Sequence, residues 1–216
     1  ESHRFLAADL VVRSGRELPT AWLEQAREQG IEAALTLVFP SMVQAGEEGM
    51  QLVSVKAVSA GYPLRGELTF SAQPFGPVMP ARAGPGRGEV WLESRLFALL
   101  DVAIGDRVAI GEASFTVAAA ARTEPDQAAT FSGYGPRVLM HYDDIPATKV
   151  VQPGSRVEYR QLFAAPEAAL EEFRQWLQPQ LGDGERLLTV TEGQPGIGNP
   201  LSRAERFLLL AGILGV

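Results

Sequence analysis

The side chains of this 216-residue chain that could perform acid–base chemistry at neutral pH are two histidines, His3 and His141. A nucleophilic hydrolase needs a histidine oriented by a carboxylate, and His141 is followed closely by Asp143 and Asp144. A small hydrolase that uses these three residues is therefore one hypothesis. The chain has no G-x-S-x-G motif to supply a nucleophile. We favour the alternative, in which His141 lies late in a strand and is exposed near a turn.

The composition argues against metal and cofactor chemistry. The chain has no cysteine and two histidines, which excludes thiolate sites and makes a zinc site unexpected. Neighbouring carboxylates such as Glu47 and Glu48 point in different directions on a regular element, so they do not converge on one ion unaided. The glycine-rich segment 84–88 lacks the Lys-Ser/Thr pair of a phosphate-binding loop. We therefore expect no catalytic residue, no metal and no cofactor.

Four apolar residues form a different kind of candidate site, a contact surface. Phe70, Phe75, Val78 and Met79 lie within residues 61–88, a segment rich in glycine and proline that predicts loops and turns. Aromatic and methionine side chains on a proline-rich loop can contact a partner or an apolar cargo. The alternative is that they pack beneath the loop as a small satellite cluster. Both interpretations stay open at this point.

The last ten residues, 207–216, contain no polar side chain. Ser202 and Glu205 form an S-x-x-E capping box just before them, which predicts that a helix begins near residue 202. A bilayer-spanning helix needs about 20 apolar residues, so we expect residues 200–216 to be a stalk that leads into a truncated transmembrane helix. The alternative is a helix buried in a core or a dimer interface. The expected membrane-entry residues are Ser202, Glu205, Phe207, Leu208, Leu209 and Leu210.

Hydrophobic periodicity predicts the elements that position these candidates. Residues 5–61 read as β-α-β-β, with Thr20 capping the helix and Pro40 breaking or bulging the second strand. Residues 155–192 read as β-α-β, and residues 62–154 between them show the short strands and frequent turns of a small barrel or sandwich. The sequence thus predicts an α+β fold in which both chain ends build one layer around a β-rich insert. The predicted strands are 5–13, 32–43, 51–58, 68–70, 89–93, 107–110, 114–121, 137–142, 155–163 and 185–191, and the helices are 20–29, 94–100 and one that starts at Pro166.

The charge balance excludes two classes of partner. The formal net charge is −7 at pH 7, so the chain offers no basic field for nucleic acid or for an anionic membrane surface. Hydrophobic residues make up 46% and charged residues 21%, a balance that excludes a disordered chain and allows a substantial core.

Several segments, in serial order, resemble the extracytoplasmic region of bacterial ABC-transporter permeases of the FtsX/MacB type, and most closely the YbbP-like permeases. Together they cover nearly the whole chain, and their order carries the resemblance more than any single motif does. The segments are FLAADLVVRSGRELPTAWLEQAREQG, VSVKAVSAGYPLRGEL, EVWLESRLFALLDVAIGDRVAIG, PRVLMHYDDIPATKVVQPGSRVEYR and SRAERFLLLAGILGV.

The resemblance implies a periplasmic domain of a permease in the bacterial inner membrane, with a MacB-like core. This core has a porter-like α+β part made from both chain ends and an inserted β-rich part. The permease would couple ATP-driven motion of its membrane helices to export or extraction of a hydrophobic or lipid-related cargo, or to a periplasmic partner.

The resemblance also implies particular partners. These are a separate cytoplasmic ABC ATPase, the bilayer through flanking helices, a second permease chain, and a periplasmic esterase/lysophospholipase such as the one associated with YbbP-like systems. It supplies no catalytic residue to carry over. A soluble partner-binding or dimerisation module is the alternative function, and the His141 hydrolase is the third.

Overall fold

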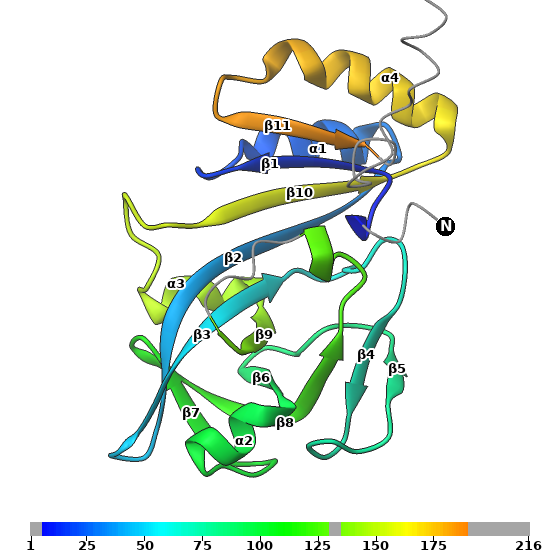
Figure 1. The fold of residues 1–216 in the computed structure, drawn as a ribbon. Helices are drawn as coiled ribbons and strands as arrows, with labels where there is room; N and C mark the ends of the chain where they lie inside the picture. Colours follow the sequence, from blue (N-terminus) through cyan, green and yellow to red (C-terminus); the bar gives the residue numbers. More distant parts are fainter. Residues whose placement is uncertain (1–5, 130–134, 190–216) are drawn as a thin grey trace, which may run out of the picture.

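The computed structural model describes residues 6–129 and 135–189, which form one continuous mixed sheet with short helices packed against it (Figure 1). The sheet runs in the order β11-β1-β10-β2-β3-β9-β6-β8-β4-β5, and β7 pairs with β2 and β8. The strands are β1 Leu10–Ser14, β2 Glu32–Ala45, β3 Gly49–Val58, β4 Leu68–Ser71, β5 Met79–Ala81, β6 Glu89–Glu93, β7 Arg107–Ile110, β8 Ala113–Thr123, β9 Arg137–His141, β10 Glu158–Ala164 and β11 Glu185–Thr189. The helices are α1 Thr20–Glu28, α2 Ser94–Leu100, α3 Ile145–Thr148 and α4 Glu167–Leu177, with 3-10 turns η2 Gln127–Ala129, η3 Tyr142–Asp144 and η4 Gln178–Gln180.

The upper part of Figure 1 is an antiparallel layer built from both ends of the described chain. Its strands lie in the order β11-β1-β10-β2, and the chain passes through them as β1-α1-β2 and later β10-α4-β11. This is the split β-α-β arrangement. Both helices cover the same face, where Trp22 and Phe173 are buried against Leu10, Val12 and Phe163. The layer expected from the two chain ends is therefore observed.

The lower part is a closed barrel. Strands β2, β3, β9, β6, β8 and β7 follow one another, and β7 pairs again with β2, so the ring has no free edge. Alternate strand residues such as Val55, Val117 and Val138 fill the interior, and α2 adds Leu96 and Phe97 to the same core. The insert strands β6 to β9 thus close into a small barrel together with β2 and β3 of the first half, and the predicted α+β class with a β-rich insert is confirmed.

Strand β2 belongs to both parts. Its first half, Glu32–Val38, pairs with β10, and Val43 and Gln44 near its end pair with β7. On its other edge β3 accompanies it from Thr36 to Ala45 with no shift in register. The two parts are therefore joined by unbroken backbone pairing.

The expected break at Pro40 is wrong. Pro40 lies within β2 opposite Ser54, and the Ser54 N–H points the other way, to the Pro136 carbonyl at 2.9 Å. The backbone nitrogen of Pro40 therefore points away from β3, and the pairing with β3 needs no N–H donor from this residue. On the far edge β2 has no partner between Val38 and Val43, where β10 has ended and β7 has not begun. Proline is tolerated because no ladder bond is lost.

The first strand begins later than expected. Residues 5–13 were expected as a strand, but β1 starts at Leu10. Leu6, Ala7 and Ala8 are all buried, but they lie outside the sheet. The Ala7 carbonyl accepts hydrogen bonds from the N–H groups of Leu64 and Arg65, at 2.9 and 3.0 Å, so this segment pairs with a loop in place of a strand.

Two smaller expectations also need correction. The N-cap position of α1 is Pro19, and Thr20 is the first helical residue, so Thr20 does not cap the helix. The segment 61–88 contains two short strands, β4 and β5, where one was expected. The boundaries of β6, α2 and β7 agree with the sequence prediction. The proposed division at residues 61, 154 and 192 stays a prediction.

A buried charge cluster fixes the loop after β8 onto the outside of the barrel. Lys56 of β3 is 4% exposed and donates to Asp126 Oδ1 at 2.5 Å and to the Tyr62 hydroxyl at 3.0 Å. The Tyr62 hydroxyl donates to the same Asp126 oxygen at 2.5 Å. Glu124 pairs with Arg137 and lies 3.9 Å from Lys56 Nζ. Burial lowers the pKa of Lys56 and raises the pKa of Tyr62 well above its ordinary value.

Lys56→Met should lower the free energy of unfolding by about 3 kcal/mol, because it leaves the buried Asp126 carboxylate without its cation. Replacing both partners, with Lys56→Met and Asp126→Leu, should recover most of this loss, because no buried charge of the pair then remains. Urea denaturation followed by circular dichroism measures both changes.

Glu112→Gln is the matched control for this test. It breaks a 3.0 Å ion pair with Lys149 in which both side chains are 65% exposed. Its cost should stay below about 1 kcal/mol, because solvent screens the pair. Equal losses in Glu112→Gln and Lys56→Met would contradict the structural role of the buried cluster.

Candidate functional site

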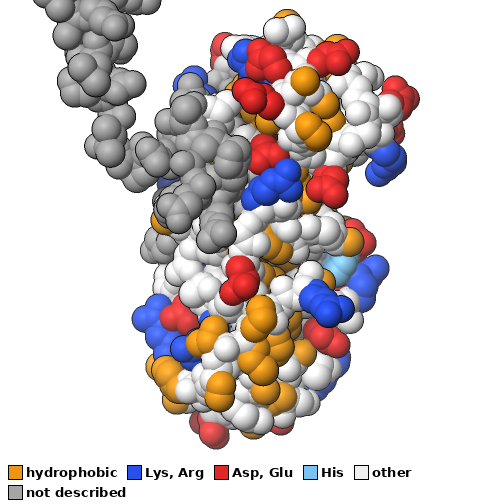
Figure 2. Space-filling view, turned by 90° about the vertical axis from the view of Figure 1, so that its right-hand side faces the viewer, with side chains coloured by type: hydrophobic (Ala, Val, Ile, Leu, Met, Phe, Trp, Pro, Cys, Tyr) orange, Lys and Arg blue, Asp and Glu red, His pale blue; other side chains and the backbone are white. Residues whose placement is uncertain are grey.

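The four apolar residues expected to form a contact surface lie around the β4–β5 hairpin. Phe75 is 74% exposed, Val78 53% and Met79 36%. Phe70 is paired with Met79 across the hairpin, is half-buried, and has its ring centre 5.5 Å from that of Trp91. Figure 2 faces this side of the molecule and shows hydrophobic side chains gathered on the lower part. We call Phe75, Val78 and Met79 the β4–β5 apolar surface; Phe70 instead anchors the hairpin.

Phe75 has an unusual backbone conformation. Its φ is 57°, in the left-handed region that bulky residues rarely adopt. Two hydrogen bonds of 3.1 Å hold the loop: the Phe75 N–H donates to Ser94 Oγ, and the Ser71 hydroxyl donates to the Gly76 carbonyl. Strain of this kind costs about 1–2 kcal/mol and is concentrated at functional sites. These bonds thus hold the backbone of the loop in a conformation that leaves the Phe75 ring exposed.

A second apolar surface, which the sequence analysis missed, lies at the tip of the β2–β3 hairpin. Met42 and Leu52 are cross-strand partners and are 44% and 47% exposed, and Met50 beside them is 52% exposed. Their neighbours Val43 and Val53 are fully buried. The predicted turn at 45–49 together with period-two alternation could have placed all three on one outer face.

The contacts of His141 support its structural interpretation. His141 is half-buried at the end of β9, and its Nδ1 accepts a hydrogen bond of 3.1 Å from the Asp143 N–H. Asp144 accepts from Arg87 Nε at 2.6 Å and from the Gly88 N–H at 2.7 Å, so it fastens a loop. Within residues 6–129 and 135–189, no serine or threonine hydroxyl bonds to His141. The geometry therefore does not assemble the hydrolase constellation considered above.

Two further features concern the part of the chain that the structure describes. This part holds no cluster of three or more metal-binding side chains. Its helices are all too short or too polar to cross a membrane. The expected membrane-entry helix with Ser202, Glu205 and Phe207 to Leu210 lies outside the described residues.

The fold is that of a known transporter domain. The periplasmic region of MacB from Actinobacillus actinomycetemcomitans aligns with a TM-score of 0.57 over 88% of this chain and 93% of that one, at 11% identity. A domain of a permease protein from Porphyromonas gingivalis aligns over 93% and 97% of the two chains, with a TM-score of 0.47 and 12% identity. No protein-family model matches the chain.

The sequence adds a closer relative. The chain is 36% identical over 214 residues to the uncharacterized ABC transporter permease YbbP of Escherichia coli (strain K12). The match covers 99% of this chain and 26% of YbbP, so the chain spans about a quarter of that relative's length. The resemblance to YbbP-like permeases is confirmed by this match, and the fold is that of the periplasmic region of MacB.

Alanine substitutions separate the anchor of the hairpin from its exposed surface. Phe70→Ala should lower the free energy of unfolding by about 2 kcal/mol, because the half-buried ring packs on Trp91. Phe75→Ala should change it by less than about 0.5 kcal/mol, because this ring is in solvent in the folded chain too. Thermal and urea denaturation measure both. A loss for Phe75→Ala as large as that for Phe70→Ala would show that Phe75 packs beneath the loop.

Proposed function

We propose that this domain is the extracytoplasmic body of an inner-membrane permease and that its β4–β5 apolar surface contacts a hydrophobic, acyl-chain-bearing cargo. In this proposal a separate cytoplasmic ABC ATPase drives the membrane helices, and the domain moves with them as one unit. The domain performs no chemistry of its own. Its periplasmic partner would be the esterase/lysophospholipase implied by the resemblance to YbbP-like systems.

The observation that carries the proposal is the outward Phe75 ring. An isolated exposed apolar residue needs no explanation, but here three fall within five positions of one hairpin and one of them occupies a strained conformation. Exposed apolar side chains gathered on one hairpin are typical of a contact site. The three side chains carry no charge, so an acyl chain or another apolar group is the chemistry that fits them.

The shared strand β2 supports the mechanical half of the proposal. Its pairing with β10 and with β7 joins the split β-α-β layer to the barrel. Motion of either part is then passed to the other through backbone hydrogen bonds, as in a rigid-body shift. The apolar surface would move with the layer.

A neutral fluorescent lipid tests the cargo contact. A pyrene-labelled monoacylglycerol should bind the purified chain, and replacing both Phe75 and Val78 by serine should weaken binding at least fivefold, because most of the exposed apolar area is lost. Met50→Ser is the matched control, because Met50 is also about half exposed but lies on the other hairpin. It should change binding less than twofold. Equal weakening by both variants would indicate unspecific adsorption and contradict the proposal.

A photo-crosslinking amino acid at position 75 of the full permease extends the test to cells. Adducts with the mass of a lipid or fatty acid would support the proposed cargo. Adducts with protein alone would overturn it in favour of a docking surface for a partner protein.

A further inference from the structure

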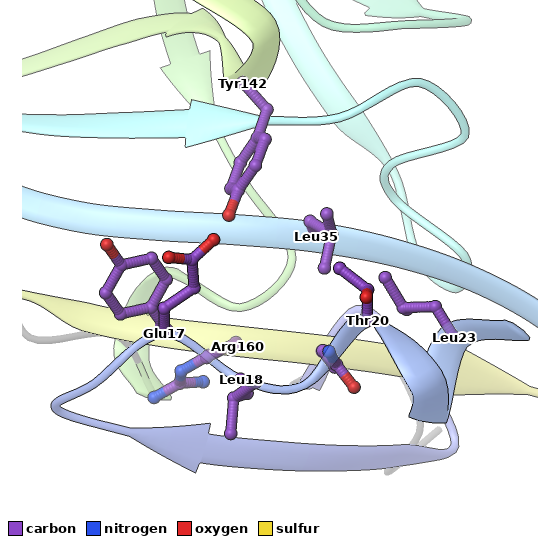
Figure 3. A pocket seen from close by; sticks show the side chains of 9 residues that line it. Glu17, Leu18, Thr20, Leu23, Leu35, Tyr142 and Arg160 are labelled. Atoms are coloured by element: carbon purple, nitrogen blue, oxygen red, sulfur yellow. The ribbon is translucent and has the colours of Figure 1, made fainter. Parts of the chain in front are cut away.

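A cavity of about 120 Å³ opens where the split β-α-β layer meets the barrel (Figure 3). Its walls come from the segment between β1 and α1, from α1 itself, from β2 and β10, and from η3 after β9. Both parts of the molecule therefore contribute to it. The β4–β5 apolar surface shares no residue with it.

The cavity presents a buried hydrogen-bond acceptor that lacks a donor. Gln161 of β10 is 1% exposed, and its Nε2 donates to the Pro19 carbonyl at 2.9 Å. Its Oε1 is buried and accepts from no donor within the described part of the chain. The Glu17 carboxylate also lines the cavity, where Figure 3 shows it directed toward the Tyr142 hydroxyl. A buried amide oxygen without a donor is rare, and a bound ligand with N–H groups would satisfy it.

Two tyrosines complete the polar side of the cavity. Burial raises the pKa of Tyr142 to about 12, and burial with the nearby Glu17 charge also raises the pKa of Tyr159. Both phenols therefore keep their protons at neutral pH, and neither adds a negative charge. Neutral tyrosine rings attract cations over their faces.

One cationic side chain, Arg160, also lines the cavity. Its Nε donates to Glu158 Oε1 at 2.5 Å, so a second carboxylate offsets the guanidinium charge. The Glu17 carboxylate and Gln161 Oε1 are both hydrogen-bond acceptors, which favours a ligand that carries N–H donors.

We propose that this cavity binds a small primary ammonium group. The ammonium would lie between the Glu17 carboxylate and Gln161 Oε1, and its methylene groups would contact Leu23 and Leu35. The cavity has room for several water molecules, at about 10–15 Å³ of this volume for each, which is enough for ethanolamine or the end of a lysine side chain. The inference is independent of the proposed function.

Calorimetric titration tests the proposal. Ethanolamine should bind the purified chain with a Kd of about 0.1–5 mM, near the limit for four non-hydrogen atoms. Ethylene glycol, its uncharged isostere, should bind at least tenfold more weakly. Nα-acetyl-lysine methylamide offers the same ammonium on a peptide. Tighter binding of this probe would identify a protein lysine as the source, and tighter binding of ethanolamine a free amine or a lipid headgroup.

Variants locate the site. Glu17→Gln should weaken ethanolamine binding at least tenfold, and the exposed position of Glu17 allows this variant to fold. Glu24→Gln, an exposed glutamate of α1 outside the cavity, should change binding less than twofold. Ethanolamine should also shift the side-chain amide resonance of Gln161. Equal effects of the two variants, or an unmoved Gln161 resonance, would overturn the proposal and indicate general attraction to a chain of charge −7.

Discussion

Strand β2 pairs with β10 along its first half and with β7 near its end. The register of this one strand therefore sets how the layer and the barrel are aligned with each other. Residues such as Leu37 and Val43 point into the barrel, while Val38 lies on the face where Lys56 is its cross-strand partner. A slip of one residue would exchange these faces along the whole strand. The barrel, the open layer and the buried charge cluster are therefore positioned by the same set of backbone hydrogen bonds.

Local signals predicted most elements of this fold. The short apolar run within residues 89–93 and the short apolar helix that follows predicted β6 and α2 with correct bounds, because both are decided by neighbouring residues. The prediction at Pro40 was wrong because the effect of a proline on a strand depends on whether its neighbours on both edges need its N–H. The gap between β10 and β7 beside Pro40 arises from the tertiary structure, so the local sequence does not reveal it. Likewise, closure of the barrel depends on β7 meeting β2, which no local pattern reports.

For the candidate sites too, the features set by neighbouring residues were predictable and those set by tertiary contacts were not. The composition of the loop around Phe75 identified it as a candidate site. Its left-handed backbone and the hydrogen bond from the Phe75 N–H to Ser94 Oγ depend on tertiary structure, which no local pattern reports. The cavity was not anticipated, because Glu17, Tyr142 and Gln161 are far apart in the sequence and none belongs to a motif. The exposed hairpin tip was within reach, since turn position and alternation together define its outer face.

The position of β1 between β10 and β11 has a consequence for synthesis of the protein. Both hydrogen-bonding edges of this early strand are satisfied by segments about 150 residues or more downstream, and pairings so distant in sequence form slowly. While the ribosome translates the intervening barrel, the apolar Leu10-Val11-Val12 stretch has no strand beside it. The nascent chain therefore exposes an unpaired apolar strand that can associate with other polypeptides. A chaperone that binds extended apolar segments would bind this strand.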